Sequence, residues 1–340
     1  MTNAQTTQGD DLESSTQAHV GGRHGFKTIA RRALASQYLA LLAALAVLLL
    51  LVRTQNAAVF SVANLIDIGV AVSIIGILAL AQTVVLISGG LDISIGSIAG
   101  LASVCTAMAI AAGFNAVIAL AVALGVGVGA GGFNAFVITR LKINPIIATL
   151  ATFSAFSGLA LVLSDGRAIT AQDPAFRFVG IERIFGLPIP LIMFLSFALA
   201  VHLFLTYTIL GRHIYALGSN SVAARNTGIS LVRYKVAIYT FSGLVGGAAG
   251  ALLVARTRLG TEAGTSVLGL TAITAALLGG AALTGGRGKV VGVVLGVALL
   301  GVLDNGLVLT RTPPFYADVA VGLLLIVAIA IQEFRRRAGD

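Results

Sequence analysis

The chain has 340 residues, of which 57% are hydrophobic and only 10% are charged, and its mean hydropathy is +0.99. Soluble domains carry about 25% charged residues, so this composition excludes a soluble enzyme and indicates a polytopic membrane protein. The single cysteine excludes a disulfide scaffold or a multi-cysteine metal site. The net charge of +9 is typical of basic loops that fix membrane topology, and it does not point to a nucleic-acid partner.

Apolar segments fill most of the chain between two polar ends. Residues 1–36 are predicted to form a partly disordered cytoplasmic tail, and residues 333–340 a second cytoplasmic tail. A helix needs about 20 apolar residues to cross the hydrocarbon core, so residues 37–332 predict an all-α bundle of about ten transmembrane helices. The predicted spans are 37–53, 66–88, 93–112, 115–138, 145–163, 188–208, 236–255, 267–284, 290–309 and 317–332.

The basic residues predict the orientation of this bundle. With the N-terminus inside, 15 of the 22 Lys and Arg residues fall in inside segments and 7 fall outside. Cytoplasmic loops carry the excess of Lys and Arg, so both termini are predicted to be cytoplasmic. Two loops are long enough to have a function of their own: residues 164–187 on the outer side, which the family resemblance described below would make periplasmic, and residues 209–235 on the cytoplasmic side.

One polar break interrupts the apolar stretch 56–112, which fits two helices, or two helices plus a re-entrant segment. The break is Gly89–Gly96, and it contains Asp92 and Ser94. A carboxylate at membrane depth is costly and usually faces a cavity or a partner, but both residues are also good helix caps. We therefore hold two readings open, a helix cap and a contact with the transported solute. Asp92, Ser94 and the intramembrane Asn305 are the candidate lining of a substrate pathway.

Pairs of glycines four residues apart predict close helix packing within the membrane. They are Gly96 and Gly100, Gly125 and Gly129, Gly243 and Gly247, Gly246 and Gly250, and Gly292 and Gly296.

Two glycine-rich segments resemble nucleotide-binding motifs but lack the residues or the structural context that those motifs require. Gly127–Gly132 matches GxGxxG but lies inside an apolar span, where no strand precedes it. A Walker A motif would need Gly in place of Leu283 and Ser or Thr in place of Val290. The four histidines have no metal-ligand spacing. We therefore predict no cofactor, no metal site and no enzyme activity in this chain itself.

Four segments in this order resemble the permease subunit of the ribose/xylose-type branch of ATP-binding-cassette sugar importers. They are Gly89–Gly96, Ile143–Leu150, Tyr215–Ile229 and Gly269–Gly296. The resemblance runs from about residue 37 to residue 332. It implies a multi-pass protein of the bacterial inner membrane that translocates a monosaccharide, of the pentose or hexose class.

The same resemblance implies partners. These are a cytoplasmic ATP-binding subunit, a periplasmic sugar-binding protein and a second permease subunit, either a copy of this chain or a paralogue; membrane lipid is a further partner of this chain. Residues from about Asn220 to Gly228 would form the coupling element that docks on the ATPase, with Asn220, Ala223, Arg225 and Gly228 as its candidate residues. Two positions depart from the family pattern, because many relatives carry Glu in place of Ser221 and Asn in place of Asp304.

A second reading comes from a different class of transporter. A self-contained, proton-coupled carrier of a small polar solute would use Asp92 and Asp304 as a proton relay, although we find no clear inverted repeat of the kind such carriers often show. A membrane-embedded enzyme is a third class, but no converging set of acids, histidines or metal ligands supports it. The sequence names no particular sugar, and branched-chain amino acids are a distant option.

Overall fold

The computed structural model describes residues 22–313 and 315–339, and the predicted disorder of the first residues lies outside this part of the chain. Its elements are α1 (Gly22–Gln55), η1 (Ala57–Phe60), α2 (Val62–Ile87), α3 (Ile95–Ala111), α4 (Ala116–Thr139), α5 (Pro145–Ser164), β1 (Ile169–Thr170), α6 (Pro174–Ile181), β2 (Arg183–Ile184), β3 (Leu187–Pro188), α7 (Ile189–Tyr207), α8 (Ile209–Ser219), α9 (Ser221–Asn226), α10 (Leu231–Thr257), β4 (Leu259–Gly260), α11 (Thr265–Leu278), α12 (Val290–Leu309) and α13 (Phe315–Gly339).

Seven helical stretches among the described residues are long and apolar enough to cross a membrane: α2, α4, α5, α7, α10, α12 and residues Tyr38–Gln55 of α1. Three shorter apolar helices, α3, α11 and residues Phe315–Ala330 of α13, coincide with the other predicted spans. The prediction of a helical membrane bundle is therefore confirmed. The count of ten crossings stays a prediction, because these three helices are shorter than the usual span of about 20 residues.

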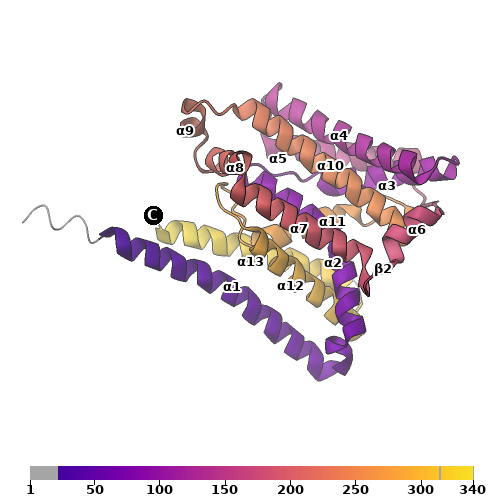
Figure 1. Ribbon diagram of the computed structural model, residues 1–340, viewed down its shortest axis with the longest axis horizontal. Coiled ribbons are helices and arrows are strands. Elements are labelled where there is room, and N and C mark those ends of the chain that lie inside the picture. The colour runs from indigo at the N-terminus through magenta and orange to yellow at the C-terminus, as the bar shows by residue number, and fades with distance from the viewer. Residues whose placement is uncertain (1–21, 314, 340) are drawn as a thin grey trace, which may run out of the picture.

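The two long loops lie at opposite ends of the bundle. Figure 1 shows α8, α9 and the C-terminal end of α13 at one end, and α6 with β2 at the other. α1 also begins at the end that carries α8 and α9. The described parts of both terminal helices thus point to the same end as the loop 209–235, as the predicted topology requires. The orientation of the bundle in the membrane stays a prediction.

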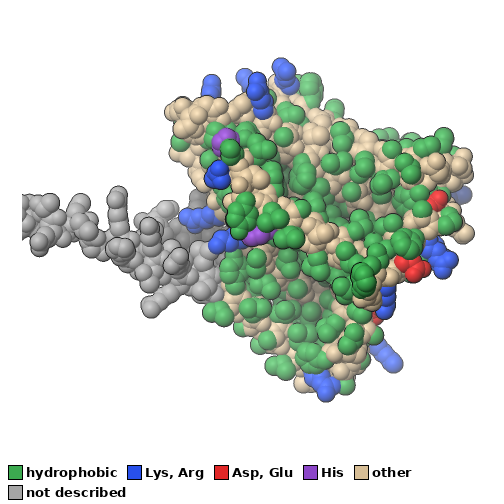
Figure 2. Space-filling model, in the orientation of Figure 1, with side chains coloured by type: hydrophobic (Ala, Val, Ile, Leu, Met, Phe, Trp, Pro, Cys, Tyr) green, Lys and Arg blue, Asp and Glu red, His purple; other side chains and the backbone are tan. Residues whose placement is uncertain are grey.

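Side-chain exposure fits a hydrocarbon environment around this bundle. Figure 2 shows hydrophobic side chains over much of the visible face, while Lys and Arg gather toward its margins. Large apolar side chains point outward from the spans, as at Val162 and Leu199, which are 73% and 58% exposed. Such an exposed apolar surface marks a membrane or protein contact, as a helical membrane bundle requires.

Glycine allows α4 and α10 to touch backbone to backbone. A Cβ added at Gly127 would meet the carbonyl of Gly243 and would lie 2.9 Å from the Cα of Gly247. The prediction of close packing is confirmed for Gly243 and Gly247. It is wrong for Gly125 and Gly129, because an added Cβ there would meet nothing within 4 Å. Those two glycines lie on the outer side of α4, where no neighbouring helix approaches.

The helices α3 and α11 are short because a glycine-rich segment lies next to each of them. α2 ends at Ile87, and the irregular segment 88–94 precedes α3, with Gly89 in the left-handed region at φ +80°. The stretch 56–112 therefore holds η1 and two helices, α2 and α3, and no separate re-entrant helix. Beside this break, residues 279–289 separate α11 from α12 and include several glycines at positive φ. Both irregular segments lie toward the end of the bundle that carries α8.

Short strands order the opposite end. β1, from the loop after α5, pairs antiparallel with β4, which follows α10, and joins Ile169 to Gly260 and Thr170 to Leu259. β2 and β3 form a small hairpin after α6. These pairings fix the loop 164–187 over the ends of α7 and α10.

Candidate functional site

The break before α3 is organised around the carboxylate of Asp92. Its Oδ1 accepts the backbone N–H of Ser94 at 3.0 Å and the hydroxyl of Ser94 at 2.6 Å. The carboxylate thus satisfies a donor at the entrance to α3 that has no partner within the helix. Ser94 stands at the N-cap of α3 but makes no side-chain hydrogen bond to the N–H groups of the helix, so Asp92 orders the turn before α3 and its role as a helix cap stays a prediction.

Two further helices reach the same cluster. The hydroxyl of Ser242, from α10, donates to Oδ2 of Asp92 at 2.6 Å. The side-chain amide of Asn134, from α4, donates to the hydroxyl of Ser94 at 2.7 Å. All four side chains are fully buried. Sequence reasoning missed Asn134 and Ser242, although a polar residue in an apolar span is the signal that would have found them.

The backbone of the break is satisfied by side chains from three helices. In the amide orientation that satisfies both of its ends, Gln82 donates to the carbonyl of Asp92 at 3.3 Å and accepts its N–H at 3.1 Å. The hydroxyls of Thr149 and Tyr239 donate to the carbonyl of Leu91 at 3.3 and 3.4 Å. Irregular backbone at membrane depth persists only where protein supplies its hydrogen bonds, and α2, α5 and α10 do so here.

The third candidate pathway residue lies elsewhere. Asn305 exchanges two hydrogen bonds with Asn64, at 3.0 and 2.9 Å. Asn64 is near the start of α2 and Asp92 follows its end, so a rise of 1.5 Å per residue puts them about 35 Å apart along that helix. Asp92 and Ser94 therefore lie together, and Asn305 does not join them. The lining of a substrate pathway by these three residues remains a prediction.

The predicted coupling residues form one compact element. The side chain of Asn220 accepts the N–H groups of Val222 and Ala223 at 3.1 and 3.0 Å and so caps α9. Gly228 ends this element at φ +85°, the left-handed conformation expected for a glycine between two short elements. Ala223 and Arg225 are both exposed. The structure brings the four residues together at the end of the bundle.

The helix before this element, α8, contacts both irregular segments through glycine. A Cβ at Gly218, near the end of α8, would collide with the carbonyl of Ile87 and would lie 2.5 Å from the nitrogen of Gly286. That nitrogen donates to the same Ile87 carbonyl at 2.8 Å. A Cβ at Gly285 would lie 2.8 Å from the Cα of Gly89. The end of α8, the break after α2 and the loop 279–289 thus meet with no side chain between them; we call this contact the glycine junction.

Tyr215 adds a side-chain contact beside the glycine junction. Its hydroxyl donates to the carbonyl of Gly288 at 2.7 Å. Burial raises the pKa of this hydroxyl above its ordinary value, so the group stays protonated and remains a donor. The loop 279–289 is therefore tied to α8 by a hydrogen bond as well as by close backbone packing.

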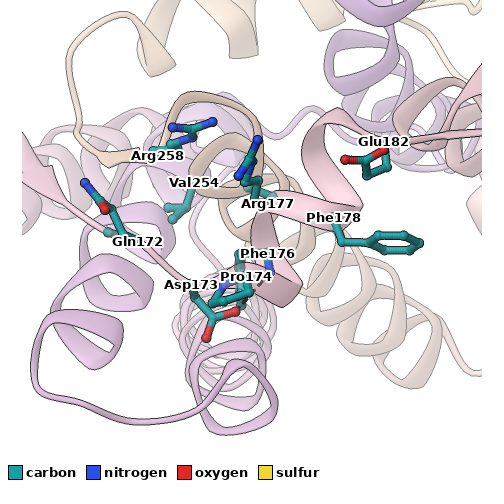
Figure 3. Close-up of a pocket in the computed structure, with 11 residues that line it drawn as sticks. Gln172, Asp173, Pro174, Phe176, Arg177, Phe178, Glu182, Val254 and Arg258 are labelled. Atoms are coloured by element: carbon teal, nitrogen blue, oxygen red, sulfur yellow. Dashed lines mark hydrogen bonds between the residues drawn. The ribbon is translucent and has the colours of Figure 1, made fainter.

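A polar pocket of about 480 Å³ lies at the opposite end, between α6 and the end of α10. Figure 3 shows it framed by charged and aromatic side chains, with the ring of Phe178 pointing outward, away from Gln172 and Arg258. Both signs of charge are present around it, so it suits polar contacts more than an apolar ligand. Its lining residues are Ala171, Gln172, Asp173, Pro174, Phe176, Arg177, Phe178, Glu182, Val254, Ala255 and Arg258.

Comparison with known families gives the class of protein. Residues 64–329 match the family described as the permease component of the branched-chain amino acid transport system. This match covers well over half of the chain, and the helical membrane bundle agrees with it. The chain belongs to this family of transport permeases, as a multi-pass protein of the inner membrane.

Individual relatives are more specific. The chain is similar to the ribose import permease protein RbsC of Bacillus subtilis, at 37% identity over 84% of this chain and 90% of the relative. It is similar to the L-arabinose transport system permease protein AraH of Escherichia coli, at 38% identity over 81% of this chain and 84% of the relative. RbsC of Escherichia coli is 32% identical over 86% of this chain and 92% of its own length. No solved structure matches the chain.

Proposed function

We propose that this chain is the membrane-spanning subunit of an ATP-driven importer of a monosaccharide, a pentose or a hexose. The observation that carries the proposal is the Asn220-capped helix α9, which stands exposed at one end of the bundle beside the glycine junction. The relatives named for ribose and arabinose favour a sugar over a branched-chain amino acid. They match over most of their length, so the likeness concerns the whole permease.

In this proposal, ATP is hydrolysed by a separate cytoplasmic subunit that binds α9, because the chain has no Walker motif of its own. A periplasmic binding protein delivers the sugar to the end of the bundle that carries α6 and the 480 Å³ pocket. A second permease subunit, a copy or a paralogue, completes the translocation pathway.

The proton-coupled carrier is the weaker candidate. A relay between Asp92 and Asp304 needs the two carboxylates close together, but Asp304 is the neighbour of Asn305, whose partner Asn64 lies near the far end of α2. Asp304 is also exposed, whereas Asp92 is fully buried. This geometry favours an external energy source.

Reconstitution tests the proposal. Vesicles that hold the permease, its ATP-binding subunit and the loaded binding protein should take up the sugar only when ATP is supplied on the inside. Measuring which sugars the co-purified binding protein holds identifies the substrate. Uptake by the chain alone, driven by a pH gradient, would replace the importer with the carrier.

A matched pair of variants tests the role of α9. Asn220→Ala removes the cap of α9, and Asn115→Ala removes the same kind of cap from α4, whose Ile118 N–H it accepts at 3.0 Å. Each loses about 1 kcal/mol of local helix stability. We expect only Asn220→Ala to weaken co-purification with the ATP-binding subunit. Equal loss in both variants would mean that the effect is general destabilisation.

A further inference from the structure

The cluster around Asp92 contains a buried carboxyl group that faces no cation. The carboxylate is fully buried, and its three hydrogen bonds come from neutral donors of Ser94 and Ser242. Within the described part of the chain, no Lys, Arg or His forms an ion pair with it. Burial of an uncompensated charge is strongly unfavourable, so the carboxylate form of Asp92 needs a positive partner.

The same cluster also contains an acceptor without a donor. Asn134 is fully buried, and its Nδ2 is used on the hydroxyl of Ser94. Its Oδ1 is buried and has no hydrogen-bond partner. Leaving a buried acceptor unpaired costs roughly 1–3 kcal/mol, and such groups are rare in native proteins.

The carboxylate form of Asp92 and the unpaired Oδ1 of Asn134 would both be stabilised by a positively charged ligand, so a single cation could satisfy both groups. We propose that a monovalent cation, for which Na⁺ is the probe, binds in the cluster between the carboxylate of Asp92 and Oδ1 of Asn134. The hydroxyl oxygens of Ser94 and Ser242 are available as further ligands. Oxygen donors of this kind suit hard cations, and broken membrane helices are a recurring place for Na⁺.

The composition of the cluster favours a cation with a single charge. Among the described residues, no group of three or more His, Cys, Asp or Glu side chains gathers that could hold a metal ion. A single carboxylate balances one positive charge, which favours a monovalent over a divalent cation. Because Asp92 is fully enclosed within this chain, a charged side chain from a partner subunit has no access to it.

The ion would connect the break before α3 to two other helices, α4 and α10. Asp92 and Ser94 belong to the entrance of α3, Asn134 to α4 and Ser242 to α10. A cation shared by all of them stabilises the packing of the broken segment against both helices. This inference does not depend on which solute the permease carries or on what drives transport.

Melting of the purified full-length chain in detergent tests the site. The chain is unfolded by heat in NaCl, KCl and choline chloride at equal ionic strength, with the Na⁺ concentration varied. We expect a saturable rise of the Tm with Na⁺, of about 5 °C at a hundredfold excess over the Kd. Equilibrium binding of radioactive sodium should reach one ion per chain.

Three variants locate the effect. Asp92→Asn and Asn134→Ala should each abolish the Na⁺-dependent rise and the sodium binding. Thr106→Val is the matched control, because its buried hydroxyl donates only to the carbonyl of Ala102 within α3; it should keep both. If a cluster variant does not fold, the wild-type comparison still decides.

Equal melting of the wild-type chain in all three salts, with no bound sodium, would overturn the proposal. The guest would then be a proton on Asp92 or a water molecule at Asn134. A Na⁺ effect that survives in Asp92→Asn would place the ion elsewhere and would overturn it equally.

Discussion

Replacing Gly228 by valine should uncouple transport from ATP hydrolysis while the protein stays folded in the membrane. Gly228 has φ +85°, and an added Cβ there would meet nothing within 4 Å. The substitution therefore causes backbone strain and no steric clash. An L-residue in the left-handed region costs about 1–2 kcal/mol, and a β-branched residue fits it least well.

The size of this strain determines the expected effect. A shift of 1–2 kcal/mol changes the ratio of two conformations by roughly 5- to 30-fold. The turn after α9 is held by only a few hydrogen bonds, such as that from the N–H of Ile229 to the carbonyl of Ala224 at 3.1 Å. Strain of that size is enough to move α9 out of its position without unfolding the bundle.

Substrate-stimulated ATP hydrolysis in the reconstituted complex is the assay. Gly228→Asn is the matched control, because asparagine tolerates positive φ, and it should retain most of the coupling. Stable expression and full stimulation of Gly228→Val would refute the assignment of this element to coupling. Equal loss in the asparagine and valine variants would assign the effect to the added side chain and not to the backbone.

Three other outcomes follow from the same structure. In a chain whose native cysteine is replaced by alanine, an impermeant thiol reagent applied to intact cells should label Gln172→Cys and not Ser219→Cys. Labelling of Ser219→Cys would show that the predicted orientation is wrong. Asp92→Asn should leave much of the uptake intact, and a protonophore should not abolish uptake into vesicles with internal ATP; loss of uptake in both experiments would favour proton coupling. Gly127→Ala should lower the Tm, because its methyl group would collide with the backbone of α10, whereas Gly129→Ala should leave the Tm unchanged or raise it slightly, since alanine favours the helix by about 0.5–1 kcal/mol. Equal Tm changes in these two variants would contradict the close contact of α4 with α10.

Much of the helical framework could be predicted because its signals are local. Hydropathy alone places the apolar helices, and the break at Ser88–Gly96 follows from three glycines and two serines beside one Asp. The positive φ of Gly228 is likewise a local property, since a glycine between two short elements often adopts it. Each of these properties depends on a few neighbouring residues, so the sequence contains it directly.

Contacts between distant segments could not be predicted in this way. Ser242 lies 150 residues from Asp92, and a lone serine in an apolar span carries no sign of its partner. Asn305 was grouped with Asp92 because both are polar and intramembrane, yet its partner is Asn64. The outer position of Gly125 and Gly129 also depends on how α4 is rotated, which the four-residue spacing does not specify.

The glycine junction has a mechanical consequence. Side chains between two moving elements act as a compliant layer, because they change rotamer and absorb small displacements. At Gly218, backbone meets backbone, so this layer is missing. Displacement of α8 toward the bundle must push against the end of α2 and the loop 279–289, whereas displacement away from it separates Gly218 from the Ile87 carbonyl and the Gly286 nitrogen, which stay hydrogen-bonded to each other. The junction therefore resists compression, and a movement of α8 toward the bundle passes directly to the end of α2, next to the break that holds Asp92.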